Sequence, residues 1–156
     1  MVTFSPQKSE SASLWVIRQG HEESTACEAG EPIQCNSYVR LTHNDSQRNL
    51  HSHRVKASLS GQNEVSGYGN DGEGDGGDDW RVECVEKTKY WERGKSVMLY
   101  HASTQAYLQC HPNAEFTRNN CGGNCPIMNH LEAFSRGNVD KNTQMVVLDA
   151  GVFLSK

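Results

Sequence analysis

The sequence predicts an all-β protein, and more specifically a β-trefoil of three four-stranded repeats, the first of them incomplete. Two runs, 38–43 and 96–101, alternate apolar and polar residues with the period of two that half-buried strands show. Turn-forming residues separate such runs, and residues 129–135 fit a helical turn or a strand equally well. The third observation is an internal repeat, and several copies of one short unit are typical of closed β-architectures.

The repeat is clearest in a pattern that occurs twice. Residues 39–43 and 97–101 both read Val-x-Leu-x-His, and further matching segments follow in the same order. A closing strand is predicted three times, at 13–17, 79–82 and 144–147. The closing strand of the repeat therefore occurs three times, whereas its opening strand occurs only twice.

The length of 156 residues favours one domain. We predict a single domain over 1–156, in which 1–26 are the remnant of repeat one, 27–90 form repeat two and 91–156 form repeat three.

The ordered motifs of the second repeat resemble the MIR domain family, and within it the stromal cell-derived factor 2 type. The stretches that carry the resemblance read CEAGEPIQCNSYVRLTHNDSQRNLHSH, LSGQNEVSGYGNDGEGDGGDDW and YWERGKSVMLYHAST. The resemblance covers residues 12–109 well and implies a β-trefoil. Such proteins begin with a signal peptide and a full first repeat. The resemblance therefore implies that this sequence enters repeat one at Val2-Thr3 and is a truncated form, a partial gene model or a splice form.

Charge and hydropathy limit the partners. The formal net charge of −4 and the absence of a Lys/Arg cluster argue against nucleic-acid binding. No apolar run is long enough for a membrane span. The sequence shows neither a signal peptide nor an ER-retention signal, so the expected location, the endoplasmic reticulum lumen or the secreted state, is implied by the resemblance. The six cysteines and the Asn44 glycosylation sequon agree with that location.

The sequence does not favour an enzyme. No serine lies in a strand-turn-helix elbow, and no cysteine has a histidine and a carboxylate at a recognisable spacing. Paired carboxylates occur only in the acidic stretch 71–79, which is too exposed in a loop to tune their pKa values. We expect neither catalytic residues nor a cofactor.

His51 and His53 are two apart on a predicted strand and therefore share a face. Their ring nitrogens suit a structural role, bonding the backbone of a buried turn, better than a ligand role. A lectin-like site would instead combine amide, carboxylate and aromatic groups. The candidate ligand-binding residues on this reading are Asp45, Asn49, His51, His53, Gln62 and Tyr68.

No metal site is predicted. The acidic run 71–76 alternates oxygen ligands with glycine, but the twelfth position of a calcium loop is Val82 and no helices flank the run. A solvated acidic loop is preferred. The cysteines and histidines of 110–130 fit no established zinc spacing, and a Cys121–Cys125 or Cys110-centred disulfide, or free thiols, is preferred there.

Cys27 and Cys84 are the main disulfide candidates. Each follows a predicted closing strand, and the resemblance implies that they pair across adjacent repeats. Cys35 is the competing partner.

The resemblance implies a non-enzymatic protein of the endoplasmic reticulum lumen that acts in chaperone complexes and protein quality control. The implied partners are BiP, J-domain co-chaperones and unfolded or glycosylated client proteins. Two alternatives remain open: a lectin-like trefoil that binds glycan directly, and an accessory MIR module of a protein O-mannosyltransferase.

Overall fold

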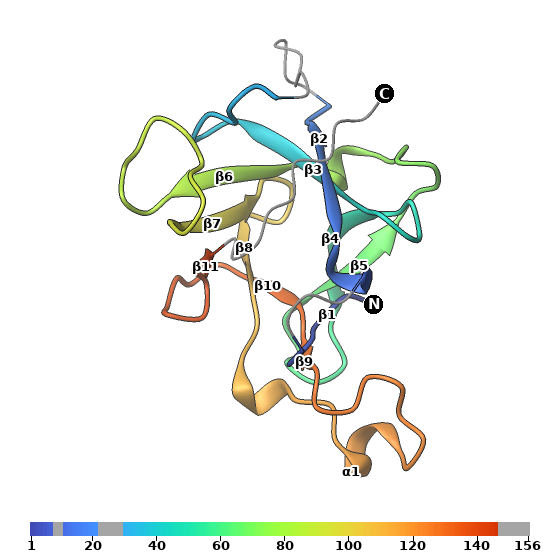
Figure 1. The fold of residues 1–156 in the computed structure, drawn as a ribbon. Coiled ribbons are helices and arrows are strands. Elements are labelled where there is room, and N and C mark those ends of the chain that lie inside the picture. Colours follow the sequence, from blue (N-terminus) through green and yellow to red (C-terminus); the bar gives the residue numbers. More distant parts are fainter. Residues whose placement is uncertain (8–10, 22–29, 147–156) are drawn as a thin grey trace.

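The computed structural model describes residues 1–7, 11–21 and 30–146. Its eleven strands account for most of the regular structure (Figure 1). The strands are β1 (Thr3–Phe4), β2 (Trp15–Gln19), β3 (Tyr38–His43), β4 (Asn49–Lys56), β5 (Asn63–Tyr68), β6 (Trp80–Cys84), β7 (Ser96–His101), β8 (Ala106–Gln109), β9 (Leu131–Glu132), β10 (Phe134–Arg136) and β11 (Met145–Val146).

Helical structure within the described part of the chain is limited to single turns. These are the 3-10 turns η1 (Ser11–Ser13), η2 (Gly76–Asp78) and η3 (Pro112–Ala114) and the α-helical turn α1 (Arg118–Cys121). Residues 129–135 contain β9 and most of β10, so the strand alternative is correct there. β9 pairs with β1, far away in sequence, and this tertiary pairing decides between two conformations that local sequence left equal.

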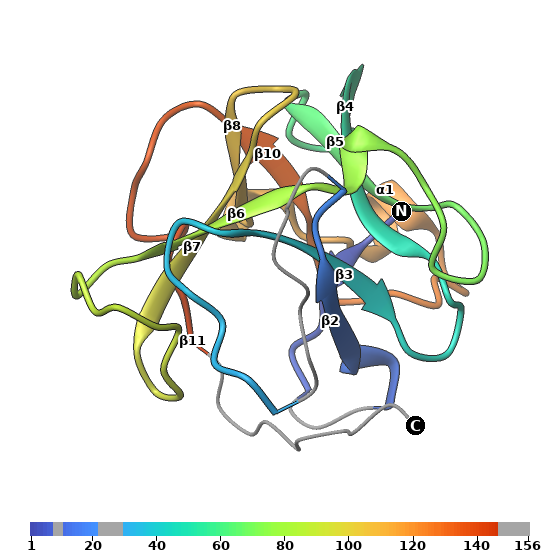
Figure 2. The ribbon, with the colours of Figure 1, turned by 90° about the horizontal axis from the view of Figure 1, so that it is seen from above.

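Seven strands close into a barrel through antiparallel pairs. Their order is β7-β6-β3-β4-β5-β10-β8, and β8 pairs back onto β7. β2 adds to β3 and β11 adds to β7, outside this ring. Figure 2 shows β2, β3, β6 and β7 following one another along the wall. The all-β prediction is confirmed, while the division into trefoil repeats stays a prediction.

Two strand pairs of the sheet, β2–β3 and β6–β7, are built in the same way. Trp15 of β2 lies opposite His43 of β3, and Trp80 of β6 lies opposite His101 of β7. The ring centroids are 5.0 Å apart in the first pair and 4.7 Å in the second. Repeated sequence patterns thus produce repeated contacts.

The core fills the centre of the barrel with aliphatic side chains around one indole. Trp80 is completely buried, and its Nε1 donates to the carbonyl of Leu50 at 2.8 Å. Burying a large aromatic ring while satisfying its N–H contributes strongly to stability. The other buried members of this cluster are Val39, Leu41, Leu50, Val65, Val82, Val97, Leu99, Leu108 and Ala133.

No helix among the described residues is long and apolar enough to cross a membrane.

Candidate functional site

The β4–β5 hairpin carries most of the candidate residues, and its first half is buried on both faces. Residues 49–52 are all buried, whereas 54–56 are exposed. Leu50 faces the core, and Ser52 meets Ser135 at 2.9 Å. The opposite face, with Asn49 and His51, is covered by the acidic loop 70–79, so the alternation expected of a half-buried strand is lost here.

Asp78 is the centre of the contact between this loop and β4. Its carboxylate is fully buried. Oδ1 accepts from Nδ1 of His51 at 2.9 Å, and Oδ2 accepts from Nδ2 of Asn49 at 3.0 Å and from the Asp75 amide at 2.9 Å. A buried carboxylate persists only when hydrogen-bonded in this way, so the network is structural.

Glycines allow the loop to approach β4. A Cβ at Gly77 would overlap Cε1 of the His51 ring and come within 2.8 Å of Nδ1. A Cβ at Gly74 would overlap Oδ2 of Asp78 and lie 2.9 Å from Nδ2 of Asn49. The LHSH motif and the glycine-rich acidic loop therefore form one packed unit.

Three histidines from different parts of the chain hold three consecutive residues of this loop. His101 bonds the Gly77 carbonyl at 2.8 Å, His51 bonds Asp78, and His21 meets Asp79 at 3.1 Å. Burial lowers the pKa of His101, and the nearby His51 lowers it further. The hydrogen bond to the Gly77 carbonyl raises the pKa but does not outweigh these effects. The buried ring is thereby favoured in its neutral form.

Three aromatic rings of the hairpin form a row in which the middle ring, His51, is mostly covered and the outer two, Tyr68 and His53, are partly exposed. The His51 ring lies 4.5 Å from that of Tyr68 and 5.5 Å from that of His53. Tyr68 is 47% exposed, and His53 pairs with Glu64 at 3.1 Å. We call His51, His53, Glu64 and Tyr68 the hairpin surface. It presents a ring face beside imidazole and carboxylate groups, which suits stacking and hydrogen bonding to a ligand.

Four of the six candidate ligand residues thus come together, but not with equal access. His51 is mostly covered and Asn49 is completely buried, where it also accepts from Thr42 Oγ1 at 2.7 Å. Asn49 therefore positions the loop and offers nothing to a ligand. His53 and Tyr68 keep the access that a binding role requires.

The remaining candidates lie elsewhere. Asp45 is in the exposed β3–β4 turn, where its carboxylate accepts from Nδ2 of Asn44 at 3.1 Å. Gln62 is at the far end of the hairpin, roughly 20 Å from Tyr68 at the rise of a strand. Asn44 is exposed, as a glycosylated residue must be, and its modification stays a prediction.

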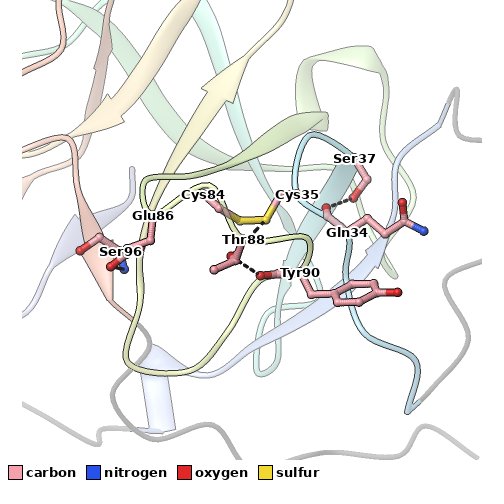
Figure 3. The surroundings of a disulfide bond; sticks show 8 residues. All are labelled: Gln34, Cys35, Ser37, Cys84, Glu86, Thr88, Tyr90 and Ser96. Carbon is pink, nitrogen blue, oxygen red and sulfur yellow. Dashed lines mark hydrogen bonds between the residues drawn. A yellow bond between two sulfur atoms is a disulfide. The ribbon is translucent and has the colours of Figure 1, made fainter.

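The Cys27–Cys84 pairing is wrong, because Cys84 is bonded to Cys35 (Figure 3). Cys84 ends β6, and the segment around Cys35 is hydrogen-bonded to the loop that follows: the Cys35 amide donates to the Lys89 carbonyl at 3.0 Å. These bonds bring the two Cα atoms to 5.7 Å. The competing partner named from the sequence is the correct one, and Cys27 lies outside the described residues.

A shallow cavity of about 400 Å³ adjoins this disulfide. Its carboxylate, Glu83, is already engaged by Arg81 and by the Tyr107 hydroxyl at 3.1 Å. The cavity is an open depression rather than a formed ligand site. Its lining residues are Cys35, Asn36, Glu83, Cys84, Val85, Lys87, Thr88 and Met98.

The second disulfide joins Cys121 and Cys125 after the turn α1, as one of the sequence alternatives had it. Cys110 is free and half-buried, and burial raises the pKa of its thiol. A buried thiol with a raised pKa is a poor nucleophile and a poor metal ligand.

Two important carboxylates were missed by the sequence reasoning. Asp78 belongs to the DDW motif, whose position before a buried tryptophan was the available signal.

Glu132 is 1% exposed and accepts from the Ser58 hydroxyl and the amides of Leu59 and Ser60 at 2.7–2.9 Å. Burial alone would raise the pKa of Glu132, but these hydrogen bonds outweigh it and lower the pKa. No local pattern marks Glu132, because its partners lie more than seventy residues away.

A family model for the MIR domain matches residues 1–89, more than half of the sequence. With its barrel and its LHSH hairpin, the chain belongs to the MIR domain family. Relatives include the stromal cell-derived factor 2-like protein of Dictyostelium discoideum, 41% identical over 115 residues, which are 74% of this chain and 53% of that protein. Human stromal cell-derived factor 2 is 46% identical over 99 residues, 64% of this chain and 45% of that protein. The chain spans about half the length of these curated relatives.

Solved structures agree with this family. The crystal structure of the SDF2-like protein from Arabidopsis thaliana has a TM-score of 0.79 at 25% identity, over 92% of this chain and 74% of that one. The structure of the S. cerevisiae protein O-mannosyltransferase Pmt1-Pmt2 complex has a TM-score of 0.76 at 24% identity, over 94% of this chain and 20% of that one. The second similarity shows a shared fold alone.

Proposed function

We propose that this chain is a non-enzymatic binding protein of the stromal cell-derived factor 2 type, acting in chaperone complexes and protein quality control in the endoplasmic reticulum lumen. The observation that carries the proposal is the 46% identity to human stromal cell-derived factor 2. Its partners are BiP, J-domain co-chaperones and unfolded or glycosylated clients. The disulfides Cys35–Cys84 and Cys121–Cys125 support an oxidising compartment.

The hairpin surface suits weak, repeated contacts with such partners. It combines an exposed ring, Tyr68, with an imidazole–carboxylate pair, His53 and Glu64. Each contact of this kind contributes little alone, but several within one complex raise the overall affinity.

The test is a pull-down from endoplasmic reticulum lumenal extract with the full chain as bait and human stromal cell-derived factor 2 as positive control. We expect both baits to recover BiP and a J-domain co-chaperone. Recovery by the control alone would refute the proposal.

Glycan binding is the second candidate function, and the exposure of Tyr68 beside His53 and Glu64 favours it. Sugar rings stack on an aromatic face while neighbouring polar groups bond their hydroxyls. A glycan array with the full chain tests it. Saturable binding that Tyr68→Ala abolishes and the exposed control Val55→Ala leaves intact would establish a lectin. A blank array would eliminate this candidate.

A further inference from the structure

Three potential metal-binding atoms meet where the acidic loop contacts β4. Nδ1 of His51 and one carboxylate oxygen each from Asp75 and Asp78 lie within 4.8 Å of one another. The distances from Nδ1 are 2.9 Å to Asp78 Oδ1 and 3.6 Å to Asp75 Oδ1. Ligands about 2.1 Å from a tetrahedral zinc ion are separated by about 3.4 Å. The two separations from Nδ1 lie on either side of this value, and the two carboxylate oxygens lie within 4.8 Å of each other, so small side-chain movements would let all three contact one ion.

The same place has more negative charge than its protein neighbours balance. Two carboxylates face one ring nitrogen, which has a single proton to donate. The acids of the loop are Asp71, Glu73, Asp75, Asp78 and Asp79, and within the described ranges none forms an ion pair with a lysine or arginine. A divalent cation at Nδ1 would supply the missing charge at the point where the carboxylates converge.

The donors are already fixed in position. His51 is held between the Tyr68 ring and the backbone at Gly77. Asp78 is held by Asn49 and the Asp75 amide, and Asp75 caps η2 by accepting from the Gly77 amide at 2.8 Å. Ligands that need little ordering lose little entropy on binding.

Access and donor type indicate the class of ion. The Asp75 side chain is 56% exposed while that of Asp78 is fully buried, so an ion would enter from solvent past Asp75 and keep water as its remaining ligand. One imidazole with two carboxylates suits zinc and neighbouring transition metals, whereas calcium takes oxygen ligands alone.

We propose that His51, Asp75 and Asp78 bind a divalent transition-metal ion, with Zn²⁺ as the best match. The ion replaces the proton that Nδ1 otherwise donates to Asp78, and it joins the acidic loop to β4. This site was not visible in the sequence, because its histidine and its carboxylates are separated by more than twenty residues. The proposal is independent of the chaperone role.

The experiment titrates Zn²⁺ into the full chain by calorimetry and records Co²⁺ absorption as a spectroscopic probe of the ligand set. Asp75→Asn is the test variant, because its amide oxygen still accepts from the Gly77 amide while the charge is lost. Asp71→Asn is the matched control, an exposed acid of the same loop outside the triad.

We expect one saturable Zn²⁺ per chain, a higher Tm with Zn²⁺, and an affinity at least about tenfold weaker in Asp75→Asn but unchanged in Asp71→Asn. The absence of saturable binding would overturn the proposal. So would equal binding by both variants, equal competition by Ca²⁺, or loss of binding in Cys110→Ser instead. A failed pull-down of chaperones would leave all these readouts unaffected.

Discussion

Gly76 and Gly77 are neighbours in the sequence, yet the structure gives them very different surroundings. A Cβ at Gly77 would meet the His51 ring, whereas a Cβ at Gly76 would have no atom within 4 Å. The need for glycine is therefore a property of the contact with β4, and it differs between adjacent positions of one loop.

We expect Gly77→Ala to lower the free energy of unfolding by about 2 kcal/mol, because the new methyl group overpacks a buried ring. Gly76→Ala should change it by less than about 1 kcal/mol. Urea unfolding of both variants measures the difference. Equal destabilisation would mean that the loop does not press on His51 as described.

Glu132 is a second position where one side chain decides a long-range contact. Glu132→Gln should destabilise the fold by about 2 kcal/mol near neutral pH, since charged hydrogen bonds to the 58–60 turn are lost. The folded pKa lies below the ordinary 4.5, so the contribution is complete above pH 4.5 and disappears as the pH falls through the folded value. The gap between variant and parent should shrink in that range.

Urea unfolding at several pH values checks this, with the exposed Glu92→Gln as control. If Glu92→Gln lost as much stability as Glu132→Gln, the loss would come from the change in net charge and not from the hydrogen bonds to the 58–60 turn.

Strands illustrate what the sequence predicts well and what it does not. β3 was predicted over its full length, because its alternating residues alternate in burial, apart from two adjacent buried positions near its end. β4 was recognised by its histidines, but the burial of both its faces depends on a loop that follows β5. An alternating pattern indicates that one face of a strand is buried. Burial of the other face by residues distant in sequence leaves no periodic pattern. The same reason explains why the sequence did not indicate Asp78, whose partners His51 and Asn49 lie on a distant strand.

The two disulfides close chain segments of very different length. Cys35–Cys84 closes a loop of sequence separation 49, and Cys121–Cys125 one of separation 4. In the chain-entropy model, replacing the first pair by serines costs about 4 kcal/mol and the second about 2 kcal/mol. Denaturant unfolding of the two double variants tests the order. A larger loss for the short loop would contradict it.

At the scale of the molecule, the same tryptophan–histidine contact occurs in two strand pairs, β2–β3 and β6–β7. The Val-x-Leu-x-His pattern predicted this repetition, and the Trp15–His43 and Trp80–His101 pairs show it in three dimensions. The pairings of β10 with β5 and β8, which complete the ring, were not predictable, since local sequence does not say which distant strand edges meet.

The whole barrel should lose stability in mild acid through His101. Its folded pKa lies below the ordinary 6.5, so the unfolded chain takes up the proton first. The contribution is complete above about pH 6.5 and declines as the pH falls toward the folded value. We expect the free energy of unfolding to decrease between pH 7.5 and 5.5, with a smaller slope in His101→Gln. An identical slope in the variant would assign the effect to other groups.

The Cys35–Cys84 bond has a further consequence for proteolysis. Arg54 and Lys56 are exposed on the protruding end of β4, inside the segment that this bond closes. A trypsin cut there leaves both pieces attached to each other. The nicked chain should migrate as one band on a non-reducing gel and separate into two only after reduction, so damage at this hairpin need not release a fragment.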